Sequence, residues 1–420
     1  MTNITKHTLE NGLTVFLKEV HAAPIISWWV VYRVGSRNEP TGKTGVSHWV
    51  EHMMFKGTPK YPGGMLDRAI DRIGGRWNAF TSLDYTMYHE TLPAEHIDLA
   101  LESEADRMTN AIFDLAETES ERTVIISERQ GSENSPMFWL REEMNAVAFR
   151  VHGYHHHVLG DLADLQTITR DDLYGHYRQH YVPTNAFVIG VGAFDTPDML
   201  AKVKTIYGAI PIAPAPKHFV RAEPEPQGER RVIVNRPGHT AFLRVSFRTP
   251  SATEPDWFKV DMLDSILTGP GGGIDNKTSR LYQALVKTEI TAGVSGGLSE
   301  TIDPYLYSIT MTVRDGHTIE EAEAAFNVAI QNVIDNGVTE AELNRAKKQA
   351  KASFAYEMES VSNQAYWIAQ SAILGEDDWY ERYLARIEAV TTQDIQEAAA
   401  RYLIPERRIT GWLVPTGLDG

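Results

Sequence analysis

The side chains best suited to chemistry lie in the run His48-Trp49-Val50-Glu51-His52. Apolar residues recur with helical spacing from Gly45 to Phe55, which predicts that the run lies on a helix. Residues four positions apart share one helix face, so the imidazoles of His48 and His52 can reach the same metal ion. Glu51 lies on that face as well, where its carboxylate can take a proton from a metal-bound water. The pattern therefore predicts a hydrolytic metal centre.

The order H-x-x-E-H is the reverse of H-E-x-x-H and is the motif of the inverzincins. The motif is short, and in a chain with 15 histidines it arises by chance roughly four times in a hundred. A surface helix that carries two unrelated histidines is therefore the competing interpretation of the pentapeptide alone.

Composition limits which groups can complete such a site. The chain has 420 residues and no cysteine, which excludes disulfides, thiolate catalysis and cysteine-ligated zinc. A catalytic zinc ion has three protein ligands and one open position for water. The third ligand must therefore be a His, Asp or Glu on another segment.

Charge and hydropathy limit the partners. The chain carries 40 basic and 56 acidic residues, a formal net charge of −16, which argues against binding to nucleic acid or an anionic membrane. This charge suits a cationic or extended peptide better. The longest apolar run, Ile25 to Tyr32, is much shorter than the ~20 residues of a membrane-spanning helix. The segment from Met1 to Lys6 lacks the apolar stretch of an export signal, so we expect a cytoplasmic protein, or a periplasmic one if a signal is removed from its precursor.

A proline-rich segment, 211–228, divides the chain into two halves of similar pattern. We expect a metal-bearing unit at 1–210 and a unit without metal at 229–420. Each half opens with apolar strand patterns and closes with a threonine-capped helix, a tyrosine, a proline and a strand. In the first half these segments are Leu13–Leu17, Ile25–Val34, Thr169–Tyr181 and Ala186–Val191. In the second half they are Arg231–Asn235, Ala241–Arg248, Thr392–Tyr402 and Ile409–Val414. The repeat predicts a duplicated α+β fold.

Several longer motifs make the chain resemble the pitrilysin/insulinase-type zinc metallopeptidases, especially bacterial members akin to the mitochondrial processing peptidase. The resemblance runs from about residue 4 to residue 415. It implies two homologous units that close over a peptide like a clamshell, one zinc ion per chain and metalloendopeptidase activity. The motifs in common are Asn11-Gly-Leu-Thr-Val, Gly35-Ser-Arg-Asn-Glu, Gly45-Val-Ser-His-Trp-Val-Glu-His-Met-Met-Phe-Lys-Gly-Thr, Gly74-Gly-Arg-Trp-Asn-Ala-Phe-Thr, Pro183-Thr-Asn-Ala and Ser279-Arg-Leu-Tyr.

The resemblance also implies where the remaining site residues lie. It makes Glu128 the third zinc ligand and gives Glu121 a role in catalysis, by orienting a ligand or supporting proton transfer. Both lie in a segment with a helical pattern, Glu117 to Glu128, which we expect to end near the helix breakers Gly131 and Pro136. The alternative is that Glu121 and Glu128 are solvated surface charges with no role at a metal site.

The segment from Gly74 to Thr81 is predicted to be a strand after a flexible turn. In the resembling family this edge strand pairs with the substrate backbone, which implies that Asn78, Ala79 and Phe80 bind substrate. An ordinary sheet strand is the alternative for each of the three residues.

Two further motifs invite a ligand-binding interpretation that we consider weaker. The tract His152-Gly-Tyr-His155-His156-His157 is rich in histidine, but three adjacent imidazoles cannot converge on one ion within a regular element, and we expect a structural role. Gly269 to Gly273 lacks the ending of a phosphate-binding loop and is expected to be a flexible hinge.

The second half departs from the family pattern. Its first predicted helix, Asp256 to Leu267, has no histidine, so no second zinc site is expected. Many family members carry an Arg and then a Tyr that hold the substrate carbonyl region near the zinc. Those positions fall here on Val286 and on Ala292 or Gly293. The departure resembles the metal-bearing subunits of two-subunit members, whose partner supplies Arg and Tyr.

Three hypotheses follow. The first is a zinc metalloendopeptidase that acts on peptides or unfolded segments, with a homologous partner subunit or as a homodimer. The second is a non-catalytic assembly subunit, like the processing-peptidase-like core subunits of respiratory complexes. The third, a different metallohydrolase with the same zinc site, has the least support.

Overall fold

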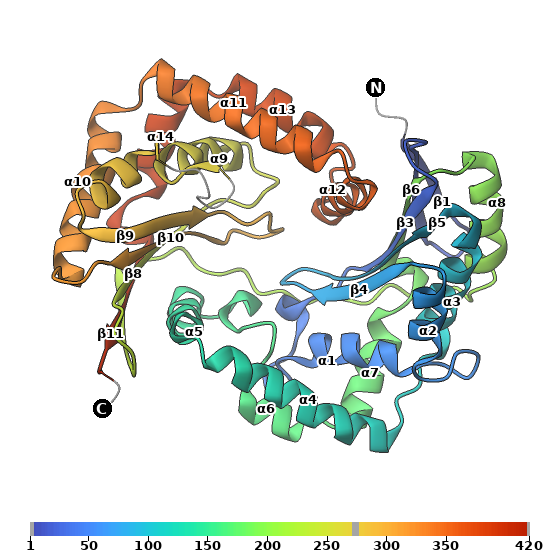
Figure 1. Ribbon diagram of the computed structural model, residues 1–420. Helices are drawn as coiled ribbons and strands as arrows, with labels where there is room; N and C mark the ends of the chain where they lie inside the picture. Colours follow the sequence, from blue (N-terminus) through green and yellow to red (C-terminus); the bar gives the residue numbers. More distant parts are fainter. Residues whose placement is uncertain (1–3, 271–276, 418–420) are drawn as a thin grey trace. The chain divides into compact units, whose positions relative to one another are not determined.

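A computed structural model describes residues 4–270 and 277–417 (Figure 1). The expected hinge at 269–273 thus lies partly outside the described residues. The chain forms two compact units, and neither is continuous in sequence. The first unit comprises residues 1–131, 152–221 and 358–377, and the second comprises 132–151, 222–357 and 378–420. The boundary near residue 221 falls within the proline-rich segment 211–228, which has almost no regular secondary structure.

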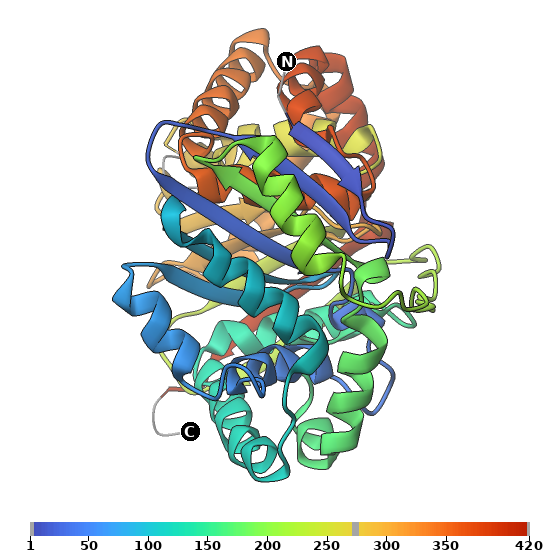
Figure 2. The same ribbon diagram turned by 90° about the vertical axis from the view of Figure 1, so that its right-hand side faces the viewer.

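The first unit is built on a six-stranded sheet in which only β2 and β6 are parallel. Helices α3 (Ile97–Asn110) and α8 (Thr196–Tyr207) pack on one face, and both lie in front of the strands in Figure 2. Helix α12 (Val361–Leu374) packs against β3 and β6 on the other face. The strand order is β1 (Ile4–Thr8), β2 (Thr14–Glu19), β6 (Ala186–Gly192), β3 (Ile25–Tyr32), β5 (Thr86–Pro93) and β4 (Arg76–Thr81).

The helices on both faces explain why the central strand β3 is a continuous apolar run. Trp28 points toward α8, where its indole nitrogen donates a hydrogen bond to the hydroxyl of Tyr207 (3.1 Å). Its neighbour Trp29 points the opposite way and contacts Tyr366 of α12, with ring centroids 6.3 Å apart. Alternate residues of one strand therefore enter two different apolar layers.

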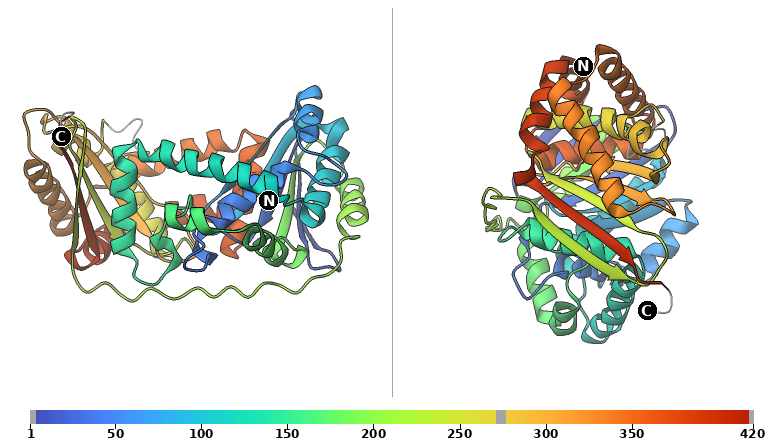
Figure 3. Two further views of the ribbon diagram at one scale, coloured as in Figure 1. Left: turned by 90° about the horizontal axis from the view of Figure 1, so that it is seen from below. Right: turned by 90° about the vertical axis from the view of Figure 1, so that its left-hand side faces the viewer.

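The second unit repeats this topology with five strands, and β11 lies between β7 and β8 (Figure 3, right). Its order corresponds position by position to β2-β6-β3-β5-β4 of the first unit, including one parallel pair, β7 with β11. The predicted duplicated α+β fold is confirmed. The strand order is β7 (Arg230–Arg236), β11 (Arg408–Pro415), β8 (Phe242–Arg248), β10 (Leu306–Val313) and β9 (Thr291–Gly297).

Each half of the sequence contributes one helix to the other half's sheet. Helix α5 (Pro136–Ala148) packs against β7 and β11 of the second unit, whereas α12 packs against the first. The approach of α5 is close: a Cβ atom on Gly411 of β11 would lie 2.3 Å from the sulfur of Met144. The two compact units therefore differ from the expected division at 1–210, 211–228 and 229–420. Segment 132–151 belongs to the second unit, and segment 358–377 belongs to the first. An amphipathic pattern shows that a helix is packed, but not which sheet it covers.

Helix ends follow local chemistry, with two differences from the expectations. Helix α4 (Leu115–Glu133) continues through Gly131, and Pro136 begins α5, a position where its missing N–H breaks no helical bond. Helix α7 (Arg170–His180) has the capping box of Thr169 and Asp172. Helix α14 (Thr392–Tyr402) has the same box, but its cap is Thr391, one residue before the expected threonine.

Among the described residues, no helix combines the length and hydropathy needed to cross a membrane.

Candidate metal centre

The H-x-x-E-H run lies on α1 (Val46–Met53), as predicted. The helix packs against α7 and against the edge strand β4. Trp49, Val50 and Met53 are fully buried in the core of the first unit, which fixes the rotation of the helix about its axis. This rotation places His48, Glu51 and His52 on the remaining face.

Helix α4 brings Glu128 to the two histidines. The Nε2 atom of His52 lies 3.5 Å from Oε2 of Glu128, and Nε2 of His48 lies 3.8 Å from the same oxygen. Ligands of a tetrahedral zinc ion with bonds of about 2.0–2.1 Å lie about 3.4 Å apart. Within the described part of the chain, these three residues form the one group of His, Asp or Glu side chains whose geometry suits a metal ion. The donor set and the spacing both fit zinc.

The protonation of His48 also suits a ligand. Burial lowers the pKa of His48 to about 3, and the nearby His52 and His157 contribute in the same direction. The ring is therefore neutral at physiological pH, with a nitrogen lone pair free to bind a metal.

Glu121 contacts His52 from the side away from Glu128. Its Oε1 atom lies 2.9 Å from Nδ1 of His52, and its other oxygen forms an ion pair with Lys56. Burial raises the pKa of Glu121, but the hydrogen bonds from Lys56 and His52 outweigh burial and leave it below the ordinary value. A carboxylate on Nδ1 fixes the ring so that Nε2 faces Glu128, a common support for metal-binding histidines. Lys56 was not predicted as a site residue, although it lies in the motif around His48.

Glu51 lies beside the three candidate ligands and is 7% exposed. Burial raises the pKa of Glu51 to about 7, and a hydrogen bond from Thr81 opposes this rise. The Thr81 hydroxyl lies 2.6 Å from Oε2 of Glu51. A carboxyl group with a pKa near 7 can both take up and release a proton at neutral pH. Thr81 was not predicted as a site residue. The sequence places it at the end of a strand but gives no sign that it contacts Glu51.

The three expected substrate-binding residues occupy different environments on β4. This strand ends the sheet order and pairs only with β5 among the described residues. Asn78 is exposed and helps line a cavity of about 820 Å³ together with Glu51 and His52. Ala79 is buried, whereas Phe80 points to the opposite face and packs against Trp29.

The histidine tract does not add a metal site among the described residues. Nδ1 of His152 accepts a hydrogen bond from the Tyr154 backbone, and Nδ1 of His155 lies 2.8 Å from the His152 carbonyl. His156 contacts Glu39, at 2.9 Å. These contacts lie within the first unit and hold the tract in place.

The second unit has apolar or small side chains where the family pattern has Arg and Tyr. Val286 ends a helical turn, Tyr282–Val286, and Ala292 and Gly293 lie on β9. Helix α9 (Asp256–Leu267) occupies the position equivalent to α1 and carries no histidine.

Comparison with known proteins agrees with this asymmetry. Residues 14–162 match the family described as Insulinase (Peptidase family M16), and residues 167–350 match the Peptidase M16 inactive domain. The chain belongs to the M16 peptidase family. The resemblance inferred from the motifs is thus confirmed, and the three candidate metal ligands all lie in the segment that matches the insulinase description.

M16 relatives share nearly the whole chain. Zinc protease PqqE of Helicobacter pylori is 29% identical over 421 residues, which cover 97% of this chain and 92% of the relative. The probable mitochondrial-processing peptidase subunit beta of Arabidopsis thaliana is 26% identical, with coverage of 94% and 75%. The crystal structure of a protease from Helicobacter pylori matches with a TM-score of 0.93 at 25% identity, covering 99% of this chain and 100% of that one.

Proposed function

We propose that the chain is a zinc-dependent metalloendopeptidase that hydrolyses peptides or unfolded polypeptide segments. The observation that carries the proposal is the convergence of His48, His52 and Glu128 with a buried carboxyl group, Glu51, beside them. One zinc ion per chain is proposed, held by these three side chains. The names of two relatives, a zinc protease and a processing peptidase subunit, support the same choice.

Each residue of the proposed site has a separate role in hydrolysis. Zinc held at this site supplies a Lewis acid that acidifies water and polarises a peptide carbonyl. Glu51 takes the proton of the attacking water and passes it to the leaving amine. Thr81 holds one oxygen of Glu51, which restricts the carboxylate to the orientation that faces the cavity. Glu121 keeps the His52 ring in place and is a positioning residue.

The substrate is proposed to bind as an extended strand along β4. The edge of this strand that no other described strand pairs with offers backbone donors and acceptors to a peptide, the mode known as β-augmentation. Asn78, Ala79 and Phe80 would then contact it mainly through their backbone, because their side chains point in different directions. The compartment, cytoplasmic or periplasmic, stays a prediction.

A homologous partner that carries an Arg and a Tyr is proposed to complete the site, and a homodimer is the other arrangement. The absence of polar side chains at Val286, Ala292 and Gly293 supports a divided site. The same observation favours the second candidate, a non-catalytic core subunit. We prefer the enzyme because such a subunit has no need of a base beside a metal site.

The substitution Glu51→Gln tests the proposal, because it keeps the shape of the side chain and removes the base. Zinc content should stay at one ion per chain, while chelator-sensitive cleavage of an unfolded peptide should fall at least about 100-fold. The exposed Glu320→Gln on α10 (Ile319–Asn336) is the matched control. Wild-type protein that binds zinc but cleaves nothing, alone or with a homologue, would favour the core-subunit hypothesis.

A further inference from the structure

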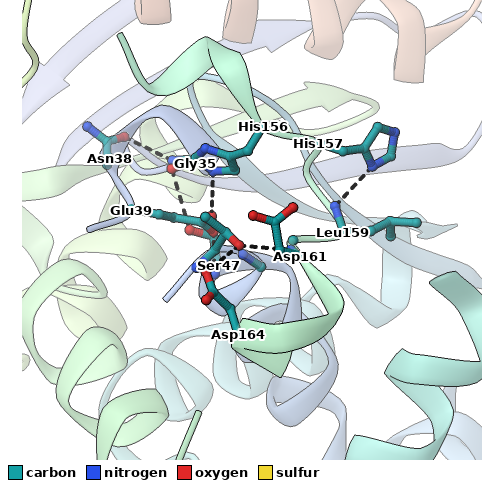
Figure 4. Close-up of polar contacts among 12 residues, drawn as sticks. Gly35, Asn38, Glu39, Ser47, His156, His157, Leu159, Asp161 and Asp164 are labelled. Atoms are coloured by element: carbon teal, nitrogen blue, oxygen red, sulfur yellow. Dashed lines mark hydrogen bonds and ion pairs between the residues drawn. The ribbon is translucent and has the colours of Figure 1, made fainter. Parts of the chain in front are cut away.

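The metal helix α1 is capped by a residue six positions before its N-cap. The side chain of Glu39 accepts hydrogen bonds from the backbone amides of Gly45 and Ser47, both at 2.8 Å (Figure 4). Gly45 itself has no side chain that could cap the helix. Glu39 thus satisfies amides of the first turn and places a negative charge at the positive end of the helix dipole.

The histidine tract supplies the partner of this cap. Nε2 of His156 lies 2.9 Å from Oε2 of Glu39, and both side chains are almost completely buried, with 3% and 0% exposed. Burial by itself lowers the pKa of His156. The hydrogen bond with Glu39 and the charges of Glu39, Asp161 and Asp164 outweigh this effect, so the pKa is raised above its ordinary value. A buried carboxylate that loses a cationic partner is strongly destabilised.

Backbone contacts lock the same two loops together. Gly160, at a φ of +76°, lies so close to Thr44 that a Cβ atom would meet the Thr44 carbonyl oxygen at 2.2 Å. Asp164 accepts hydrogen bonds from the amide and the hydroxyl of Thr44, at 2.9 and 2.7 Å. At the other end, a Cβ atom on Gly153 would meet the carbonyl oxygen of Arg37 at 2.3 Å. The loop 152–164 therefore fixes both ends of the segment that leads into α1.

We infer that Glu39 and His156 are positioning residues of the metal centre, and that the histidine tract acts on the bound metal through the start of α1 rather than as a ligand. Three site residues, His48, Glu51 and His52, lie within the two turns that follow the cap. A change in the first turn shifts all three relative to Glu128 on α4. The inference rests on the proposed zinc site.

Two substitutions test the inference. Glu39→Gln replaces one acceptor oxygen by an NH₂ group that opposes a helix amide, and His156→Gln keeps a donor but removes the charge. We expect zinc affinity, measured by competition with a chelator, to fall about 10- to 100-fold, the usual cost of losing a residue that supports a metal ligand. We also expect kcat to fall at least about 10-fold with KM within about threefold, because substrate contacts on β4 do not depend on the cap. The control is His317→Gln, which removes an exposed imidazole that lies 3.0 Å from Glu321 in the second unit.

Melting temperatures without zinc separate positioning from plain destabilisation. A variant that melts earlier yet keeps zinc affinity and kcat within about twofold of wild type would overturn the inference. If Glu39→Gln does not fold, His156→Gln decides the matter by the same criteria. If the wild-type protein cleaves no peptide, the proposed function fails, but the comparison of zinc affinities still tests the positioning role.

Discussion

Thr81, the last residue of the edge strand β4, donates a hydrogen bond to Glu51 of the metal helix α1, with 2.6 Å between the two oxygens. The contact joins the strand proposed to bind substrate to the proposed general base. A peptide added to the edge of β4 would therefore lie next to the residue that takes the proton.

Replacing Thr81 tests whether this contact matters for catalysis. Thr81→Val has nearly the same shape but no hydroxyl, so Glu51 loses its donor and its fixed orientation. We expect kcat to fall about 10-fold while zinc content stays at one ion per chain. Thr81→Ser keeps the hydroxyl and serves as the control. Equal kcat values for the Val and Ser variants would show that the hydrogen bond has no catalytic role.

The metal assignment makes a graded prediction. His52→Ala removes a ligand and should abolish most zinc binding, as elemental analysis of the purified protein can show. Glu121→Gln leaves the ligands intact but weakens the support of His52, so zinc affinity should fall about 10- to 100-fold. His96→Ala, at a side chain that is 42% exposed, should bind zinc like the wild type. Full zinc in His52→Ala would refute the assignment.

A buried carboxyl group in the second unit predicts a pH dependence of stability. Burial raises the pKa of Asp264 from 3.8 to about 6, against the opposing hydrogen bonds from Thr268 and Tyr307. A carboxyl group with a raised folded-state pKa stabilises the fold below its unfolded pKa, and this contribution is lost as the pH rises through about 6. The loss is on the order of 3 kcal/mol for a shift of about two pKa units.

The side chain of the Asp264→Asn variant cannot ionise, so this variant does not lose stability in this way as the pH rises. Its free energy of unfolding relative to wild type should rise between pH 4 and pH 8, as measured by urea denaturation of the zinc-free proteins. The exposed Asp315→Asn should show no such trend relative to wild type. A difference for Asp264→Asn that does not change with pH would contradict the prediction.

The sequence predicted the local elements of the site better than its tertiary contacts. Helix α1 and the pair His48 and His52 follow from periodicity, because ligands one turn apart are a local feature. Glu128 required the family resemblance, since 76 residues separate it from His52. Thr81 and Lys56 were missed as partners of Glu51 and Glu121, because a hydrogen bond between distant segments leaves no periodic signal. The positions of α5 and α12 were missed for the same reason.

The last prediction concerns the missing Arg and Tyr. A site with a metal and a base but no Arg/Tyr pair can still hydrolyse peptides. It lacks that pair's donors, which would hold the carbonyl and stabilise the developing oxyanion. Losing one such donor typically costs about 10²–10³ in rate. We therefore expect the isolated chain to be a weak peptidase, and a homologous partner that carries both residues to raise its activity at least about 100-fold on the same unfolded peptide. A partner with its Arg and Tyr changed to Ala and Phe is the control for binding without chemistry. If the isolated chain is already fully active and the partner adds nothing, the site is complete within one chain and the divided-site hypothesis is wrong.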